Sequence, residues 1–184
     1  MKKVIGFDSW TGGASHFARL VPKFEAIGFD LQLVHIGSWG NEPECPRECR
    51  MGELLVRDIA FYGNNSLEKI LDIEQPVAAI LLSTDTFAHR AFIRYCDQRH
   101  IPTLNLFHGL VGLTERISES GAYVVSYRAH ARYVLSRLGK LIKYTFPCYI
   151  KALLVTKAKP EEWVRFFLDI FYMAKGDHFF RLPA

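Results

Sequence analysis

Apolar and polar positions follow two different periods along the start of the chain. Residues 3–7 form a short apolar run that stops at Asp8, and apolar positions then recur at helical spacing over residues 14–27. Gly28 ends this helical pattern, and residues 30–36 (DLQLVHI) have the composition of a second strand. The opening segment therefore predicts a strand–helix–strand unit whose two strands are parallel neighbours.

The pattern changes twice in the next segment. Residues 37–51 are rich in Gly, Pro, Asn and Glu without periodicity, which predicts a long exposed loop. Residues 54–61 predict a third strand, and the polar residues 64–66 supply capping chemistry for a short helix that ends at residue 73.

A fourth strand is predicted at residues 76–82, an uninterrupted apolar run typical of a strand buried on both faces. Thr84 or Asp85 is predicted to cap a helix that extends to about residue 99, and residues 102–107 predict a fifth strand. Strands that alternate with helices are typical of α/β folds, so we predict a Rossmann-like, doubly wound parallel sheet. Ligands bind such sheets beyond the carboxyl ends of the strands.

The C-terminal third has a different pattern. Apolar positions over residues 127–142 form one helical stripe, and an apolar, aromatic stretch follows at residues 163–173. Basic residues lie opposite the stripe, namely Arg132, Arg137, Lys140 and Lys143. We predict a Rossmann-like domain over residues 1–126 and an amphipathic helical extension over residues 127–184. Its cationic face is typical of a helix at an anionic membrane surface, and the alternative is a helix that covers the sheet.

Composition and charge restrict the location and the partners. The 184 residues are 49% hydrophobic and 23% charged, which is typical of a globular protein. The first apolar run is too short for a signal peptide, and no run approaches the roughly 18 residues of a membrane-spanning helix. We therefore expect a cytoplasmic protein, peripheral at the inner face of the cell membrane if the extension binds lipid. The net charge of +4 is small for a nucleic-acid partner, and we expect none.

The cysteines do not predict a metal site. Cys45 and Cys49 are close in sequence, but no second Cys or His pair follows at matching spacing. The alternative to a metal site is a pair of reduced thiols in a Pro-containing loop, and this is the interpretation we adopt.

Two motifs resemble the GT-B glycosyltransferases. The first motif lies near the N-terminus and consists of a strand, the Gly12-Gly13 loop, a helix and another strand. The other motif is the strand that ends in His108-Gly109 (IPTLNLFHGL). Similar motifs occur in GT-B families that build bacterial surface and capsular polysaccharides. The resemblance spans residues 1–110.

The resemblance implies the first of two Rossmann-like domains. In GT-B enzymes this domain mainly holds the acceptor, and the second domain mainly holds the nucleotide sugar. The chain contains only the first, so we expect a missing C-terminal donor-binding domain and an isolated domain without activity. A nucleotide sugar would be the co-substrate, the acceptor would be a glycan or a lipid-linked sugar, and no further cofactor is implied.

The candidate site residues lie beyond the first and last predicted strands. Gly12 and Gly13 would let backbone N–H groups face an anion, or they mark a tight turn that needs glycine. His16, in the first turn of the helix, is either a base for a sugar hydroxyl or a solvated residue. Asp8 could hold such a group or cap the loop.

His108 is the strongest catalytic candidate. It ends a predicted strand, and Gly109 beside it permits close approach of a ligand. Imidazole as a group titrates near neutral pH and can serve as a base or a hydrogen-bond donor. A buried structural histidine is the alternative. With Asp8 or His16 it would supply the base for a metal-independent sugar transfer. The rival functions are a nucleotide-sugar epimerase of the same fold and a non-catalytic α/β binding or regulatory module.

Overall fold

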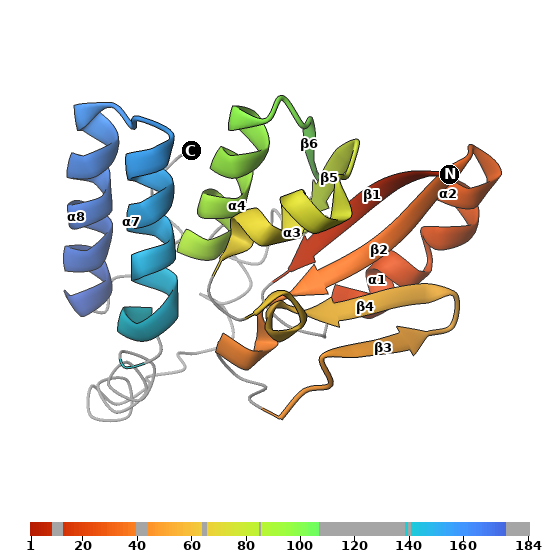
Figure 1. The fold of residues 1–184 in the computed structure, drawn as a ribbon. Coiled ribbons are helices and arrows are strands. Elements are labelled where there is room, and N and C mark those ends of the chain that lie inside the picture. The colour runs from red at the N-terminus through yellow and green to blue at the C-terminus, as the bar shows by residue number, and fades with distance from the viewer. Residues whose placement is uncertain are drawn as a thin grey trace, which may run out of the picture.

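A computed structural model describes residues 1–8, 13–39, 44–63, 66–84, 86–106, 139 and 141–175. Within them, a twisted sheet is covered by helices on both faces, and a pair of long helices packs at one side (Figure 1). The strands are β1 (Lys2–Asp8), β2 (Phe29–His35), β3 (Glu48–Met51), β4 (Leu54–Asp58), β5 (Ala78–Leu81) and β6 (Thr103–Asn105).

The sheet confirms the predicted fold class. Its order is β3-β4-β2-β1-β5-β6, and every neighbouring pair is parallel except β3 with β4. The chain therefore builds outward from β1 in one direction, through β2 and β4, and then in the other, through β5 and β6. This is the doubly wound, Rossmann-like arrangement, and β1 and β2 are parallel neighbours as predicted.

The first predicted helix is two helices in the structure. They are α1 (Ala14–Ala18) and α2 (Val21–Ala26), with Arg19 and Leu20 between them. Pro22 explains the break, because its ring removes a backbone donor and clashes with the carbonyl four residues earlier in a continuous helix. Gly28 ends α2 as predicted, with a left-handed φ of 83°.

The predicted loop over residues 37–51 contains regular structure. A short 3-10 helix, η2 (Gly37–Trp39), follows β2, and β3 pairs antiparallel with β4 through a turn at Gly52, whose φ is 60°. All four residues of β3 are exposed, so this edge strand has no apolar alternation for a sequence pattern to detect.

Two other boundaries differ from the prediction. The third predicted strand ends at Asp58, because the Asp58 carboxylate caps the 3-10 helix η3 (Ile59–Tyr62) by accepting from the backbone N–H of Ala60. Helix α4 (Phe87–Gln98) is capped by Thr86 rather than by Thr84 or Asp85. Helix α3 (Leu67–Glu74) begins after Ser66, close to its predicted position.

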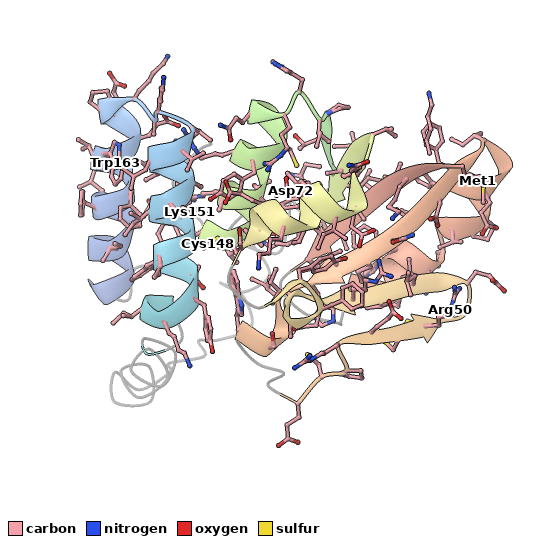
Figure 2. The ribbon with its side chains drawn as sticks, in the orientation of Figure 1. Met1, Arg50, Asp72, Cys148, Lys151 and Trp163 are labelled. Carbon is pink, nitrogen blue, oxygen red and sulfur yellow. The ribbon has the colours of Figure 1, made fainter. Side chains whose placement is uncertain are left out.

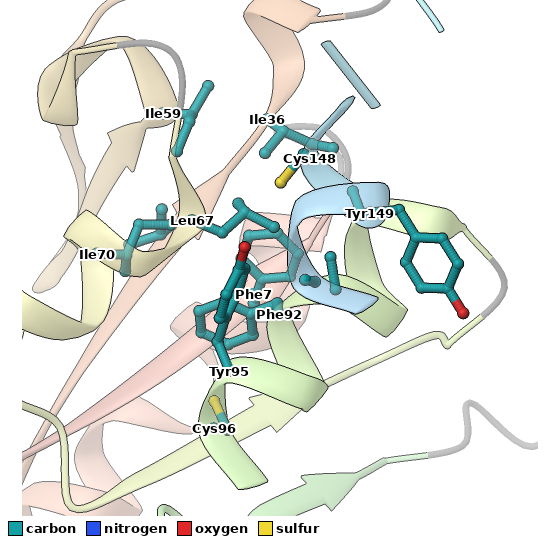
Figure 3. Packing of buried hydrophobic residues seen from close by; sticks show 14 of the residues in the cluster. Phe7, Ile36, Ile59, Leu67, Ile70, Phe92, Tyr95, Cys96, Cys148 and Tyr149 are labelled. Atoms are coloured by element: carbon teal, nitrogen blue, oxygen red, sulfur yellow. The ribbon is translucent and has the colours of Figure 1, made fainter. Parts of the chain in front are cut away.

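Each face of the sheet carries its own core. Val4, Leu31 and Leu33 pack with α1 and α2 on one face, while Ile5 and Phe7 pack with α3 and α4 on the other. Figure 3 shows the second core, in which Phe7 and Phe92 stack with ring centroids 4.2 Å apart. Alternate residues of β1 thus face opposite layers, as the pleat of a strand requires.

The described part of the C-terminal extension packs on α4. A short π-helix, η4 (Leu141–Thr145), leads into α7 (Phe146–Val155) and α8 (Pro160–Lys175), which lie side by side in Figure 1. Tyr149 and Phe166 contact Phe87 of α4, with ring centroids 5.2 and 5.4 Å away, respectively. Lys151, labelled on α7 in Figure 2, forms an ion pair with Glu68 of α3.

The membrane prediction concerns mainly residues that the structure does not describe. Most of the apolar stripe at 127–142, with Arg132, Arg137 and Lys140, lies outside the described residues. Within the described helices, none is long and apolar enough to cross a membrane.

Candidate functional site

The strand order changes direction between β1 and β5. After β4 the chain returns past β2 and β1 to form β5 on the other side of β1. In open α/β sheets, ligands bind beyond the carboxyl ends of the strands at such a switch point. The residues that end β1 and those that follow β5 are therefore the first place to look for a site.

Asp8 ends β1 and lies against Gly13. Gly13 has a φ of −69° and a ψ of −18°, a conformation that any residue can adopt. A Cβ atom at this position, however, would lie only 2.0 Å from Oδ2 of Asp8. Glycine is thus needed at position 13 for close approach, and the nearby negative group is the carboxylate of Asp8 itself.

His89 reaches the same place from the first turn of α4, beyond β5. Its side chain is 1% exposed. The backbone N–H of His89 donates to Oγ1 of Thr86 at 3.2 Å, and Nδ1 of His89 lies 2.8 Å from the same oxygen. Because that oxygen already accepts the backbone N–H, its own proton is available to Nδ1. With the imidazole proton on Nε2, Nδ1 would accept from the Thr86 hydroxyl; with the proton on Nδ1, it would donate to the same oxygen.

Asp8 and His89 face each other across the switch point. Oδ1 of Asp8 lies 4.0 Å from Nε2 of His89, and the ring of Phe7 meets the imidazole edge-on with a centroid distance of 5.4 Å. A distance of 4.0 Å exceeds a hydrogen bond but allows strong electrostatic interaction in a buried place. Carboxylate and imidazole are the two side chains most used for general acid–base chemistry.

The structure brings together only part of the predicted site. Asp8, the last residue of β1, and Gly13, just before α1, are adjacent. His16 is exposed on α1. Gly12, His108 and Gly109 lie outside the described residues, so their roles stay predictions.

Thr86 and His89 were not predicted as site residues. The candidate residues were chosen beyond the carboxyl ends of the first and last predicted strands, and they did not include the helix that follows β5. The local signal was present, because a Thr at the helix cap and a His three residues later are in reach of each other. The contact with Asp8 could not be predicted, since it depends on how β1 and β5 pair.

A second aspartate–histidine pair lies at the ends of β2 and β4. Nδ1 of His35 is 3.3 Å from Oδ2 of Asp58, and each side chain is 1% exposed. Ser38 donates to Asp58 twice, from its backbone N–H at 3.0 Å and from its hydroxyl at 2.5 Å. The sulfur of Cys45 joins the pair, and the three groups could hold a metal ion.

Two thiols are unsuited to nucleophilic chemistry. Burial raises the pKa of Cys96 to about 12 and that of Cys148 to about 11. Both therefore stay protonated at neutral pH, and a protonated thiol is a poor nucleophile.

Glu74 is the centre of a separate ionic cluster. Its carboxylate accepts from Lys3 at 2.5 Å, from Arg57 at 2.6 Å and from the hydroxyl of Tyr62 at 2.7 Å. Burial alone would raise the pKa of Glu74, but the hydrogen bonds from Lys3 and Tyr62 and the nearby positive charges outweigh it and lower the pKa. All its partners come from the body of the domain, so we assign this cluster to stability.

No protein-family model matches the chain, and no curated protein or solved structure is significantly similar to it. The geometry of the described residues therefore carries the functional argument together with the motifs.

Proposed function

We propose that this chain is the acceptor-side domain of a GT-B-type glycosyltransferase that adds a sugar to a glycan or to a lipid-linked acceptor. The observation that carries the proposal is the Asp8–His89 pair at the β1–β5 switch point of a Rossmann-like sheet. The motifs Gly12-Gly13 and His108-Gly109 support it from the sequence. The donor would be a nucleotide sugar held mainly by a further domain or subunit.

The pair has the chemistry that an acceptor hydroxyl requires. Asp8 would accept the hydrogen bond of the attacking hydroxyl and, during transfer, its proton. The new glycosidic bond forms as the bond between the sugar and the diphosphate breaks, and the diphosphate leaves with the nucleotide. His89 would act as a positioning residue, because with its proton on Nε2 it would present a donor to Asp8 while Nδ1 accepts from Thr86. His108 remains a second candidate for the base.

The surroundings of Asp8 support a role in which its orientation matters. Gly13, just before α1, and His89, in α4, approach the carboxylate from two different segments. A group with close neighbours on two sides would lose little freedom when it engages a hydroxyl, and such preorganisation would favour both binding and transfer.

Saturation-transfer NMR tests the proposal without requiring a donor domain. The probes are a panel of short oligosaccharides and a panel of UDP-, GDP- and TDP-sugars. We expect the oligosaccharides to bind wild-type protein, and Asp8→Asn to weaken binding at least about tenfold, the effect of losing about 1.4 kcal/mol. Asp97→Asn, an exposed carboxylate on α4, is the matched control and should bind like wild type.

Two outcomes would contradict the proposal. Equal binding by Asp8→Asn and wild type would remove Asp8 from the site. Binding of the nucleotide sugars alone would favour a donor-binding module over an acceptor domain. Where transfer can be assayed with the complete enzyme, Asp8→Asn should lower the rate about 10² to 10⁴-fold, the usual contribution of a general base.

The proposal includes contact with an anionic membrane, which rests on the sequence of residues 127–142. Co-sedimentation with vesicles that contain anionic lipid should weaken as salt is raised, because salt screens the lysines and arginines. It should also weaken when Arg132 and Arg137 are replaced by glutamate. Binding that is indifferent to both changes would leave the acceptor proposal intact and remove the membrane from it.

A further inference from the structure

His35, Cys45 and Asp58 converge at the carboxyl edge of the sheet from three separate segments. His35 ends β2, Asp58 ends β4, and Cys45 lies in the connection between η2 and β3. One nitrogen, sulfur or oxygen atom of each residue lies within 4.8 Å of the corresponding atoms of the other two. His35 and Asp58 are buried, and Cys45 is half-buried.

His35 and Asp58 bring two possible metal-ligand atoms close together. The backbone N–H of Gly37 donates to Nδ1 of His35 at 3.1 Å, so in this arrangement Nδ1 carries a lone pair. Oδ2 of Asp58 lies 3.3 Å from the same nitrogen. A proton or a metal ion shared by the two residues would stabilise this contact, and a metal ion at Nδ1 would replace its hydrogen bond from Gly37.

Cys45 favours a metal ion over a proton. A proton would satisfy His35 and Asp58 alone, whereas a metal ion also uses the sulfur. A thiolate and a carboxylate together carry two negative charges, which one divalent ion neutralises, so the occupied site has no net charge to bury. A donor set of sulfur, nitrogen and oxygen suits zinc and similar ions and does not suit Mg²⁺ or Ca²⁺, which prefer oxygen.

The carboxylate of Asp58 is held by groups that would not compete with a metal ion. Ser38 donates its backbone N–H to Oδ2 and its hydroxyl to Oδ1, and the backbone N–H of Ala60 donates to Oδ1. These bonds fix the direction of the carboxylate while Oδ2 keeps capacity for another partner. Supporting hydrogen bonds of this kind are a regular feature of metal sites.

We propose that His35, Cys45 and Asp58 bind one zinc-class divalent ion. Three protein ligands leave a fourth tetrahedral position for water or a small ligand. On binding, the thiol of Cys45 loses its proton to solvent and forms the metal–sulfur bond. The ion joins the β2–β3 connection to the ends of β2 and β4.

Cobalt(II) titration tests the site, because a thiolate bound to cobalt produces charge-transfer absorption in the near ultraviolet. The protein is stripped with a chelator, kept reduced with a phosphine and freed of any histidine tag. We expect one equivalent of cobalt to produce this absorption together with the visible bands of a tetrahedral ion. Zinc should then displace the cobalt and remove both.

Cys49 provides a matched control. It lies four positions after Cys45, on the exposed strand β3, and neither residue is in a disulfide. We expect Cys45→Ser to abolish the charge-transfer absorption and to lower zinc affinity more than about 100-fold, since even indirect supports of metal sites contribute 10 to 100-fold. Cys49→Ser should leave the charge-transfer absorption and the zinc affinity unchanged.

Ser38→Ala, which loses only a supporting hydrogen bond to Asp58, should lower zinc affinity about 10 to 100-fold.

Three results would overturn the site. The first is that cobalt gives no charge-transfer absorption with wild-type protein. The second is that Cys45→Ser and Cys49→Ser lose equal amounts of absorption and zinc affinity. The third is that Cys45→Ser leaves the spectrum unchanged. Circular dichroism and thermal unfolding of each metal-free variant check that it is folded, and His35→Gln gives an independent second ligand test. These results are independent of saccharide binding by Asp8, so either proposal can fail alone.

Discussion

The described part of the chain contains two buried aspartate–histidine pairs at the same edge of one sheet, and their surroundings differ. Asp58 accepts three hydrogen bonds, from Ser38 and Ala60, and has Cys45 within reach. Asp8 faces a glycine whose missing Cβ gives its carboxylate room, and its histidine lies 4.0 Å away.

The difference shows that the presence of an aspartate beside a histidine does not by itself determine the role of the aspartate. A carboxylate that accepts several fixed donors is a structural support or a metal ligand, because those hydrogen bonds fix its direction. A carboxylate at a switch point, oriented by a glycine contact and a neighbouring imidazole, is suited to a ligand's hydroxyl. The following variants separate the two roles.

Removal of Asp58 should have the largest effect on stability. Asp58→Ala leaves the two donors of Ser38 and the N–H of Ala60 without their acceptor, and we expect a loss of about 3–5 kcal/mol. Asp8→Ala should lose less, about 1–2 kcal/mol. Urea unfolding of the metal-free proteins measures both, and the reverse order would contradict the assignment of roles.

Glu74 gives a reference for a carboxylate that is purely structural. Glu74→Gln should lose about 2–4 kcal/mol at neutral pH, because Lys3 and Arg57 lose their buried counter-charge. The pKa of Glu74 is lowered on folding, so its contribution is present above the unfolded pKa of about 4.3 and is lost as the pH falls through the folded pKa.

The pH dependence of unfolding checks this sign. The stability difference between wild type and Glu74→Gln should shrink when the pH is lowered below about 4.3. A difference that stayed constant over that range would mean that the charge of Glu74 is not what stabilises the cluster.

Gly13→Ala tests the contact that distinguishes Asp8 from Asp58. The added Cβ would lie 2.0 Å from Oδ2 of Asp8, and we expect a loss of about 1–3 kcal/mol, as for other overpacked sites. The same change in an Asp8→Ala background should be nearly neutral. A double-mutant cycle by urea unfolding measures the coupling, and additive losses would show that the contact is unimportant.

Thr86→Val should have the smallest effect. It removes the cap of α4 and the hydrogen bond to Nδ1 of His89, which we expect to cost about 1 kcal/mol. Ser66→Ala at the start of α3 is the control, because that side chain makes no capping hydrogen bond. NMR of the imidazole nitrogens should report a changed tautomer balance at His89, and equal stability losses in both variants would argue against the cap.

Much of the fold was predictable because most strands are buried. The apolar runs of β1, β2 and β5 and the helices between them specify a doubly wound sheet. Strand β3 was missed because its side chains are all exposed, and the first helix was predicted too long because periodicity alone ignores Pro22.

The site was predictable only where it depends on local position. Asp8 and Gly13 follow from the end of a strand and the start of a helix. His89 and the His35–Cys45–Asp58 set require contacts between segments that are far apart in the chain, and no local spacing encodes these.

Amide chemical-shift mapping tests most directly whether the β1–β5 switch point binds the ligand. Uniformly ¹⁵N-labelled protein of 21.1 kDa is titrated with the oligosaccharide that binds best in saturation-transfer experiments. We predict that the largest shifts occur at Asp8, Gly13, Thr86 and His89. Largest shifts at β3 and β4 or at α7 and α8, with the switch point unchanged, would contradict the account.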